Sequence, residues 1–242
     1  MEYVDTLLLG SGYTSIGYAA SGADCLIAEE QEIADTHFYL PLRSYRHTPY
    51  TPVTEEGRAL SGIFDSLGLF RDGKQNVNGF EPALCRYLEE RELPLLLKCR
   101  AVRCEERDGR TLVTLSTNEG LLTVACRRVI DTRSGKRNER MTVLIRACEE
   151  AAAIAASLLT GWEMTEAFYP DHYALFAPLS GDVNVALCRI ADALDGAEGI
   201  RILAVAPAFA ADGEGRLISD DDHQNPIAAF EAGYRLGREA AQ

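Results

Sequence analysis

Residues 4–29 read VDTLLLGSGYTSIGYAASGADCLIAE, and this stretch decides the fold. Val4 to Leu9 form an apolar run that predicts a buried parallel strand, and Gly10 and Gly12 follow directly. The small residues after Gly12 favour a slim helix, and Asp24 to Ala28 form a second apolar run. The stretch therefore predicts a strand, a glycine turn, a helix and a second strand, in that order.

The glycine spacing in this turn is typical of dinucleotide binding. Gly10 permits a tight turn, and Gly12, which lacks a Cβ, lets the backbone approach a pyrophosphate. The following helix would direct its N–H groups and the positive end of its dipole at the same point. Glu29 follows Gly10 by 19 residues, where a carboxylate can accept hydrogen bonds from a ribose diol. The predicted cofactor contacts here are Gly10, Gly12, Tyr13, Thr14, Ser15, Glu29 and Glu30.

Ser15 stands at the third position of the glycine pattern, where glycine normally allows a helix to pack closely against a strand. Serine is small, and Gly17, Ala19 and Ala20 keep the helix slim, so we expect the serine to be tolerated. The strand before the turn, the helix after it and the distance to the acid all support a cofactor site. The alternative is a glycine turn in an α/β protein that binds no ligand.

Length and composition favour a soluble α/β protein and exclude several classes of partner. A chain of 242 residues can bury a substantial core, and we expect a single domain over residues 1–242. A formal net charge of -13 would repel nucleic acid and anionic membranes. The sequence shows neither a basic-then-apolar leader nor an apolar run that could span a bilayer, so we expect a cytoplasmic protein.

The seven cysteines are scattered, and their odd number and mostly apolar surroundings indicate reduced thiols. The closest pair, Cys99 and Cys104, has neither CxxC spacing nor neighbouring histidines. We therefore predict no metal or redox site at these cysteines.

Residues 30–54 lack periodicity and are rich in aromatic and basic side chains. A loop of this length is usually functional or covers a site. A histidine exchanges protons near neutral pH, and an arginine can bind a carboxylate. His37, Arg43 and His47 are therefore the candidates for substrate contact or proton transfer. The alternative for each of them is a structural role in a capping loop.

Further helices and strands are predicted after this loop. Thr54 is suited to cap a helix that runs to about Leu67, and helical spacing of apolar residues marks a second helix within 79–92. A buried strand at 95–98 is followed by an antiparallel meander over 101–126, with turns at Asp108-Gly109 and at 118–120, and two further strands end at Asp131. Beyond these, a helix is expected at 139–159 and another strand of the parallel sheet at 200–206. The predicted fold class is α/β, a Rossmann-like parallel sheet with an inserted antiparallel β-meander.

This order of elements resembles the FAD-binding domain of FAD-dependent oxidoreductases with the glutathione-reductase-like fold. In that group the antiparallel sheet is followed by a strand that ends in a motif like I-D-A-T-G, and residues 129–135 read VIDTRSG. The resemblance implies that the backbone of Val102 meets the adenine and that the last helix, capped by Asn225, points its N-terminus at the flavin. The residues placed near FAD in this way are Val102, Thr132, Arg133, Ser134, Pro226 and Ile227.

The chain departs from the family pattern in several places. Arg133 replaces a small residue, so its bulk would either clash with the cofactor or serve as a phosphate partner. The glycine-aspartate pair that grips the ribityl chain is not evident before the last helix. Residues 136–199 are too few for a full substrate domain, so we expect a reduced substrate or cap segment there.

Two classes of function are therefore open. The first is a FAD-binding flavoprotein with oxidoreductase activity on a small molecule, in which FAD supplies the redox chemistry. The second is a non-catalytic binding or regulatory protein that keeps the Rossmann scaffold and has lost or weakened cofactor binding. An NAD-dependent enzyme fits less well, because the meander and the terminal helix follow the flavoprotein order. We favour FAD binding; the sequence leaves the substrate, the electron partner and the oligomeric state open.

Overall fold

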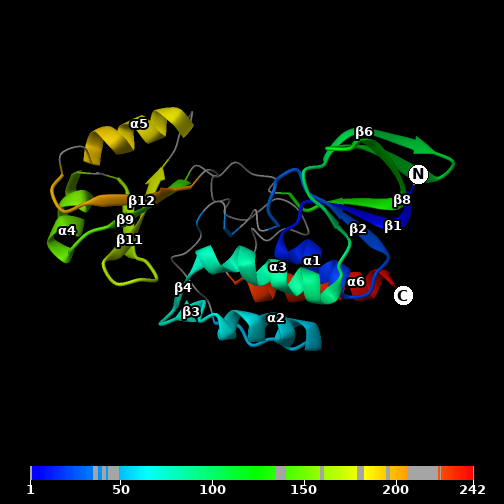
Figure 1. Cartoon of the computed structure of the whole chain (residues 1–242), viewed down its shortest axis with the longest axis horizontal. Coiled ribbons are helices and arrows are strands. Elements are labelled where there is room, and N and C mark those ends of the chain that lie inside the picture. Colours follow the sequence, from blue (N-terminus) through cyan, green and yellow to red (C-terminus); the bar gives the residue numbers. More distant parts are fainter. Residues whose placement is uncertain are drawn as a thin grey trace.

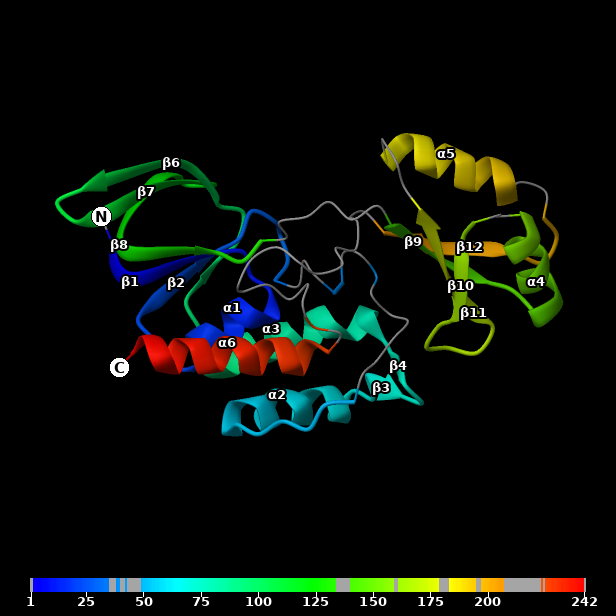
Figure 2. The same ribbon diagram turned by 180° about the vertical axis from the view of Figure 1, so that it is seen from behind.

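The computed structural model describes residues 2–34, 38–39, 42, 49–133, 140–158, 161–178, 183–194, 197–206, 223 and 225–241. These residues form two larger sheets and a short hairpin, with helices packed against both sheets (Figures 1 and 2). In the described part of the chain, every helix is too short or too polar to cross a membrane.

The first sheet has six strands in the order β5-β2-β1-β8-β7-β6. Strands β1 and β2 are parallel neighbours, with Thr6 opposite Cys25 and Leu9 opposite Ala28. Strand β5 is parallel to β2, and β6, β7 and β8 form an antiparallel meander whose last strand is parallel to β1. The bounds are β1 Glu2–Leu9, β2 Cys25–Ala28, β5 Leu95–Leu96, β6 Arg100–Arg107, β7 Arg110–Thr117 and β8 Gly120–Asp131. This topology confirms the predicted fold class.

The sequence interpretation of the chain between residues 120 and 131 was wrong in one respect. The two expected strands are a single strand, β8. Its first half pairs with β7 and its second half pairs with β1, and Cys126 has a partner in both strands. One long strand therefore joins the meander to the parallel part of the sheet.

Successive side chains of β1 point to opposite faces of the sheet, and each face packs against a hydrophobic core. Leu8 belongs to the core that includes helix residues such as Ile16 and Phe230, whereas Leu7 packs with Val113 and Leu115 of the meander. Helices α1, α3 and α6 lie against one face, and α2 lies outside them (Figures 1 and 2). The bounds are α1 Tyr13–Ala20, α2 Glu55–Ser66, α3 Phe80–Arg91 and α6 Pro226–Ala240, with a 3₁₀ turn at Val77–Gly79 and a hairpin of β3 Phe70–Arg71 and β4 Lys74–Gln75.

The predicted helix caps are confirmed. The Thr54 hydroxyl accepts a hydrogen bond from the Gly57 N–H at 2.9 Å, which caps α2. The Asn225 Oδ1 accepts bonds from the N–H groups of Ile227 at 2.8 Å and Ala228 at 3.3 Å, and Pro226 occupies the first turn of α6. Both helices therefore begin where a side chain accepts hydrogen bonds from backbone N–H groups that would otherwise be unpaired.

A second sheet is built from four strands in the order β10-β11-β9-β12. Its bounds are β9 Arg140–Arg146, β10 Glu163–Glu166, β11 His172–Pro178 and β12 Arg201–Val205. Helices α4 (Glu149–Leu158) and α5 (Val183–Leu194) cover one face around Val143, Ile145 and Leu175. On the other face, Leu144 and Phe176 belong to the same core as Tyr13.

Two predictions fail in this second sheet. Strand β12 was expected in the parallel sheet, but it pairs antiparallel with β9. The helix expected at 139–159 begins only at Glu149, because the residues of β9 pair on both sides, with β11 and with β12. The cap segment at 136–199 stays a prediction, and the second sheet extends past it to Val205.

Candidate dinucleotide site

The glycine turn lies at the carboxyl ends of β1 and β2. Gly10 has a φ of +105°, which favours glycine, and its N–H donates to the Ala28 carbonyl at 2.8 Å. A Cβ on Gly10 would lie 2.9 Å from both the Thr132 hydroxyl and the Arg133 Cγ. Gly12 is extended and precedes α1 without a side-chain cap. Gly10 is therefore required for the turn itself and for the close approach of residues 132–133.

The Ser15 side chain forms a hydrogen bond that explains a serine at the third glycine position. Its hydroxyl is buried and lies 2.6 Å from the Thr132 hydroxyl. The Thr132 hydroxyl in turn donates to the carbonyl of Leu9 at 3.0 Å or Gly10 at 3.1 Å. Because Thr132 has a single hydroxyl proton, Ser15 is the donor between the two hydroxyls. The serine thus ties α1 to the end of β8.

Glu29 binds the turn to the end of β2. Its carboxylate is buried and accepts hydrogen bonds from the N–H groups of Ser11 and Gln31, both at 2.8 Å. The Ser11 hydroxyl lies 2.9 Å from the same carboxylate oxygen as the Ser11 N–H. A carboxylate offers about four acceptor positions, so Glu29 keeps capacity for a ribose hydroxyl. Ser11, the serine between the two glycines, is the sequence signal for this contact and was not among the predicted site residues.

Arg133 crosses the same edge of the sheet. Its Nε and Nη2 donate to the two carboxylate oxygens of Asp131, each at 2.9 Å, and its Nη1 donates to Glu30 Oε1 at 2.7 Å. The Arg100 Nε lies 4.0 Å from the same Glu30 oxygen. The hydrogen bonds to Asp131, and then the charges of Asp131 and Glu30, raise the pKa of Arg133 despite its partial burial. The guanidinium therefore bridges the ends of β8 and β2.

The remaining predicted contacts differ in accessibility. The Tyr13 side chain is buried and packs edge-on against Phe38, Phe64 and Phe80. Thr14 is also buried. Val102 is 54% exposed and lies at an irregularity in the pairing of β6 with β7. His37, Arg43, His47 and Ser134 lie outside the described residues.

The N-terminus of α6 has fewer free backbone N–H groups than expected for its predicted contact with the flavin. Pro226 has no N–H, and the Ile227 N–H is taken by Asn225. Both side chains are buried. A contribution of Pro226 and Ile227 to cofactor binding therefore has to come from packing and from the helix dipole.

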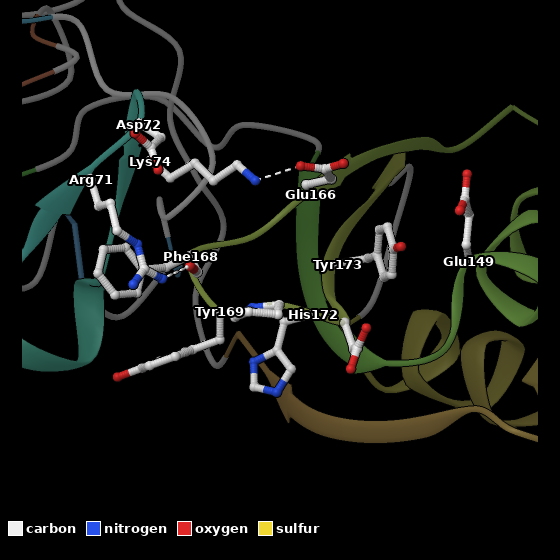
Figure 3. A pocket seen from close by; sticks show the side chains of 11 residues that line it. Arg71, Asp72, Lys74, Glu149, Glu166, Phe168, Tyr169, His172 and Tyr173 are labelled. Carbon is white, nitrogen blue, oxygen red and sulfur yellow. Dashed lines mark hydrogen bonds and ion pairs between the residues drawn. The ribbon is translucent and has the colours of Figure 1, made fainter.

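A separate cavity of about 520 Å³ lies between the β3–β4 hairpin and the second sheet (Figure 3). The Arg71 guanidinium donates to the Phe168 carbonyl at 2.8 Å and lies over the Phe168 ring, and Lys74 pairs with Glu166. Burial and the charge of Arg146 lower the pKa of His172 below its ordinary value. Among the described residues that line the cavity, none belongs to β1, α1, β2 or β8. The cavity is thus separate from the glycine turn.

Fold and turn together define an α/β protein with a Rossmann-like domain, and comparisons with known proteins agree at the level of fold. No protein-family model and no curated sequence matches the chain. It is similar to p-nitrophenol 4-monooxygenase PnpA from Pseudomonas putida, with 13% identity and a TM-score of 0.57 over 100% of this chain and 79% of that one. For OxyS anhydrotetracycline hydroxylase from Streptomyces rimosus the identity is 15% and the TM-score 0.62, over 99% and 63%.

A flavoprotein/dehydrogenase from Cytophaga hutchinsonii is similar over 100% of this chain and 78% of its own, at 13% identity and a TM-score of 0.51. The chain spans less than two thirds of the hydroxylase from Streptomyces. At these identities the likeness shows a shared fold.

Proposed function

We propose that this protein is a FAD-binding flavoprotein of the glutathione-reductase-like kind, with oxidoreductase activity on a small molecule. The observation that carries the proposal is the glycine turn at the ends of β1 and β2, held by the buried Glu29. The structural similarity to a flavoprotein/dehydrogenase, a monooxygenase and a hydroxylase supports this proposal.

The residues at the turn fit the adenosine diphosphate half of such a cofactor. Gly12 would let the backbone approach a pyrophosphate, and the start of α1 would favour its negative charge. Glu29 and Glu30 would accept hydrogen bonds from the ribose, and the backbone of Val102 would contact the adenine. When bound, FAD would supply the redox chemistry, and the chain would supply binding, orientation and electrostatics. His37, Arg43 and His47 remain the proposed substrate contacts.

One observation favours the alternative of a non-catalytic scaffold. Glu30, one of the two acids at the ribose position, is paired with Arg133 at 2.7 Å. A ribose that binds there has to compete with a guanidinium that Asp131 also holds. If the guanidinium keeps Glu30 and the ribose does not displace it, cofactor binding is weak or absent.

The test is titration of the purified protein with FAD, followed by calorimetry and by quenching of flavin fluorescence. The wild-type chain is expected to bind, and Gly12→Val is expected to abolish binding because a branched side chain fills the space of the pyrophosphate. Gly62→Val, on an open surface of α2, is the matched control and should bind as the wild type does. Absence of FAD binding by the wild type would refute the proposal.

Oxidoreductase activity needs a second measurement. The bound flavin is photoreduced, and its reoxidation by a panel of electron acceptors is recorded. Reoxidation by at least one acceptor faster than for free flavin supports an enzyme, whereas binding without any such transfer supports the scaffold.

A further inference from the structure

Arg133 forms ion pairs with Asp131 and with Glu30, one of the two acids proposed to contact the ribose. We call the group formed by Arg133, Asp131 and Glu30 the Arg133 clamp. Within it, Asp131 holds two guanidinium nitrogens, and the backbone N–H of Arg133 also donates to Asp131 Oδ1 at 3.1 Å. The third nitrogen, Nη1, pairs with Glu30, which lies two residues after the end of β2. The contact with Glu30 can therefore open while the contact with Asp131 stays closed.

Partial exposure makes this opening physically accessible. The Arg133 side chain is 40% exposed and the Glu30 side chain 33% exposed, so water can replace each partner. An ion pair of this exposure is worth little on its own and weakens further with salt. Arg100 is held less closely to Glu30, at 4.0 Å, and its own side chain is 74% exposed. Arg133 is thus the close cationic partner of Glu30 in the described part of the chain.

We propose that Arg133 competes with the ribose of the cofactor for Glu30 and thereby sets the affinity of the site. This inference rests on the proposed function, because it assigns a role to a residue at the same cofactor site. Opening of the Arg133–Glu30 pair frees the carboxylate to accept hydrogen bonds from the ribose hydroxyls. Asp131 meanwhile holds the guanidinium at the end of β8.

Adenosine is the most direct probe, because it carries the ribose diol and no charge. Its affinity is measured by calorimetry in low and high salt, beside that of ADP. Competition predicts that Arg133→Gln binds adenosine about two- to fivefold more tightly, the range expected for release of an exposed ion pair. It also predicts that salt raises the adenosine affinity of the wild type, since screening weakens the pair, and that this dependence is lost in Arg133→Gln.

Two further variants control the experiment. Arg127→Gln removes an exposed arginine of β8 whose Nε lies 3.4 Å from Asp5 Oδ1, and it is expected to leave adenosine binding unchanged. The double variant Glu30→Gln/Arg133→Gln is expected to bind adenosine no more tightly than Glu30→Gln, because the ion pair is already absent in Glu30→Gln. Urea unfolding of each variant verifies that it folds.

The outcomes separate this inference from the proposed function. Weaker ADP binding with unchanged adenosine binding in Arg133→Gln would identify Arg133 as a phosphate partner and overturn the competition. A change in adenosine affinity no larger than that of Arg127→Gln would also overturn the competition. If Arg133→Gln binds adenosine and the wild type does not, the competition is supported, and Arg133 is the residue that prevents binding in the wild type. If no variant binds adenosine, ADP or FAD, the inference and the proposed function both fail.

Discussion

Glu231 on α6 is fully buried, and its charge is stabilised by hydrogen bonds from the segment that starts α2. Its Oε1 accepts bonds from the N–H groups of Val53 at 2.8 Å and Thr54 at 2.6 Å and from the Thr54 hydroxyl at 2.8 Å. Its Oε2 accepts a bond from the Tyr50 hydroxyl at 2.7 Å. A Cβ on Gly57 would overlap Oε1, so this glycine leaves room for the carboxylate. One side chain thereby links the last helix to the start of α2.

This arrangement predicts a pH dependence of stability. Burial on its own raises the pKa of Glu231, but the hydrogen bonds from Thr54, Tyr50 and Val53 together outweigh it and lower the pKa below its ordinary value. A carboxyl group with a lowered folded-state pKa stabilises the protein above its unfolded-state pKa of about 4.3, and this contribution is lost as pH falls through the folded-state pKa. Glu231→Gln is expected to lower the free energy of unfolding by about 1–3 kcal/mol at pH 7.

Urea unfolding at pH 7 and at steps below pH 4 tests this expectation, and the difference between wild type and Glu231→Gln should shrink as the pH falls. Glu239→Gln, on the exposed end of the same helix, serves as the control. A difference that stays constant at all these pH values would contradict the assigned role of the charge.

Among the elements, α1 and α6 pack through glycine. A Cβ on Gly233 of α6 would overlap the Thr14 carbonyl oxygen, and a Cβ on Gly17 of α1 would overlap that of Phe230. The two helix backbones therefore touch directly, which brings α6 against the helix that follows the glycine turn. This contact gives a packing role to Gly233, which with Ala229 and Gly237 forms a row of small residues at four-residue spacing in α6.

Gly233→Ala is expected to destabilise the protein by about 1–3 kcal/mol, because the added methyl group has to push backbone atoms apart. Gly62→Ala, in the interior of α2 with open space around it, is the matched control and should stabilise the protein by about 0.5–1 kcal/mol. Both values are obtained from urea unfolding. Equal effects of the two substitutions would show that the helices are not in backbone contact.

The elements also show what sequence patterns can and cannot predict. The β1–α1–β2 unit and the caps at Thr54 and Asn225 were predicted because their signals are local: an apolar run, a glycine turn and a side chain beside unpaired N–H groups. The second sheet was missed because β9 and β12 are defined by pairing between residues about 60 positions apart. The Arg133–Glu30 pair joins residues 103 positions apart, so the sequence indicated an unusual Arg133 without its partner.

In the whole molecule, side chains of the β3–β4 hairpin and of the residue that follows it contact the second sheet; Figure 3 shows two of them, Arg71 and Lys74. Arg71 donates to the Phe168 carbonyl and lies 4.6 Å from the centre of the Phe168 ring, Lys74 pairs with Glu166, and the Asn76 amide donates to the Tyr169 hydroxyl at 3.0 Å. These contacts reach the last residue of β10 and the turn between β10 and β11. The orientation of the second sheet therefore depends partly on the hairpin.

Arg71→Gln removes both the guanidinium bond to the Phe168 carbonyl and the contact with the ring, which together are worth about 1 kcal/mol at an exposed site. Amide hydrogen exchange in the turn between β10 and β11 is therefore expected to quicken about fivefold, while exchange in β1 and β2 stays unchanged. Arg110→Gln is the matched control, since Arg110 lies 4.5 Å from the ring centre of Tyr3 and far along the chain from this turn. Mass spectrometry of peptides covering residues 163–173 measures the rates. Unchanged exchange there in Arg71→Gln would show that the second sheet is held without the hairpin.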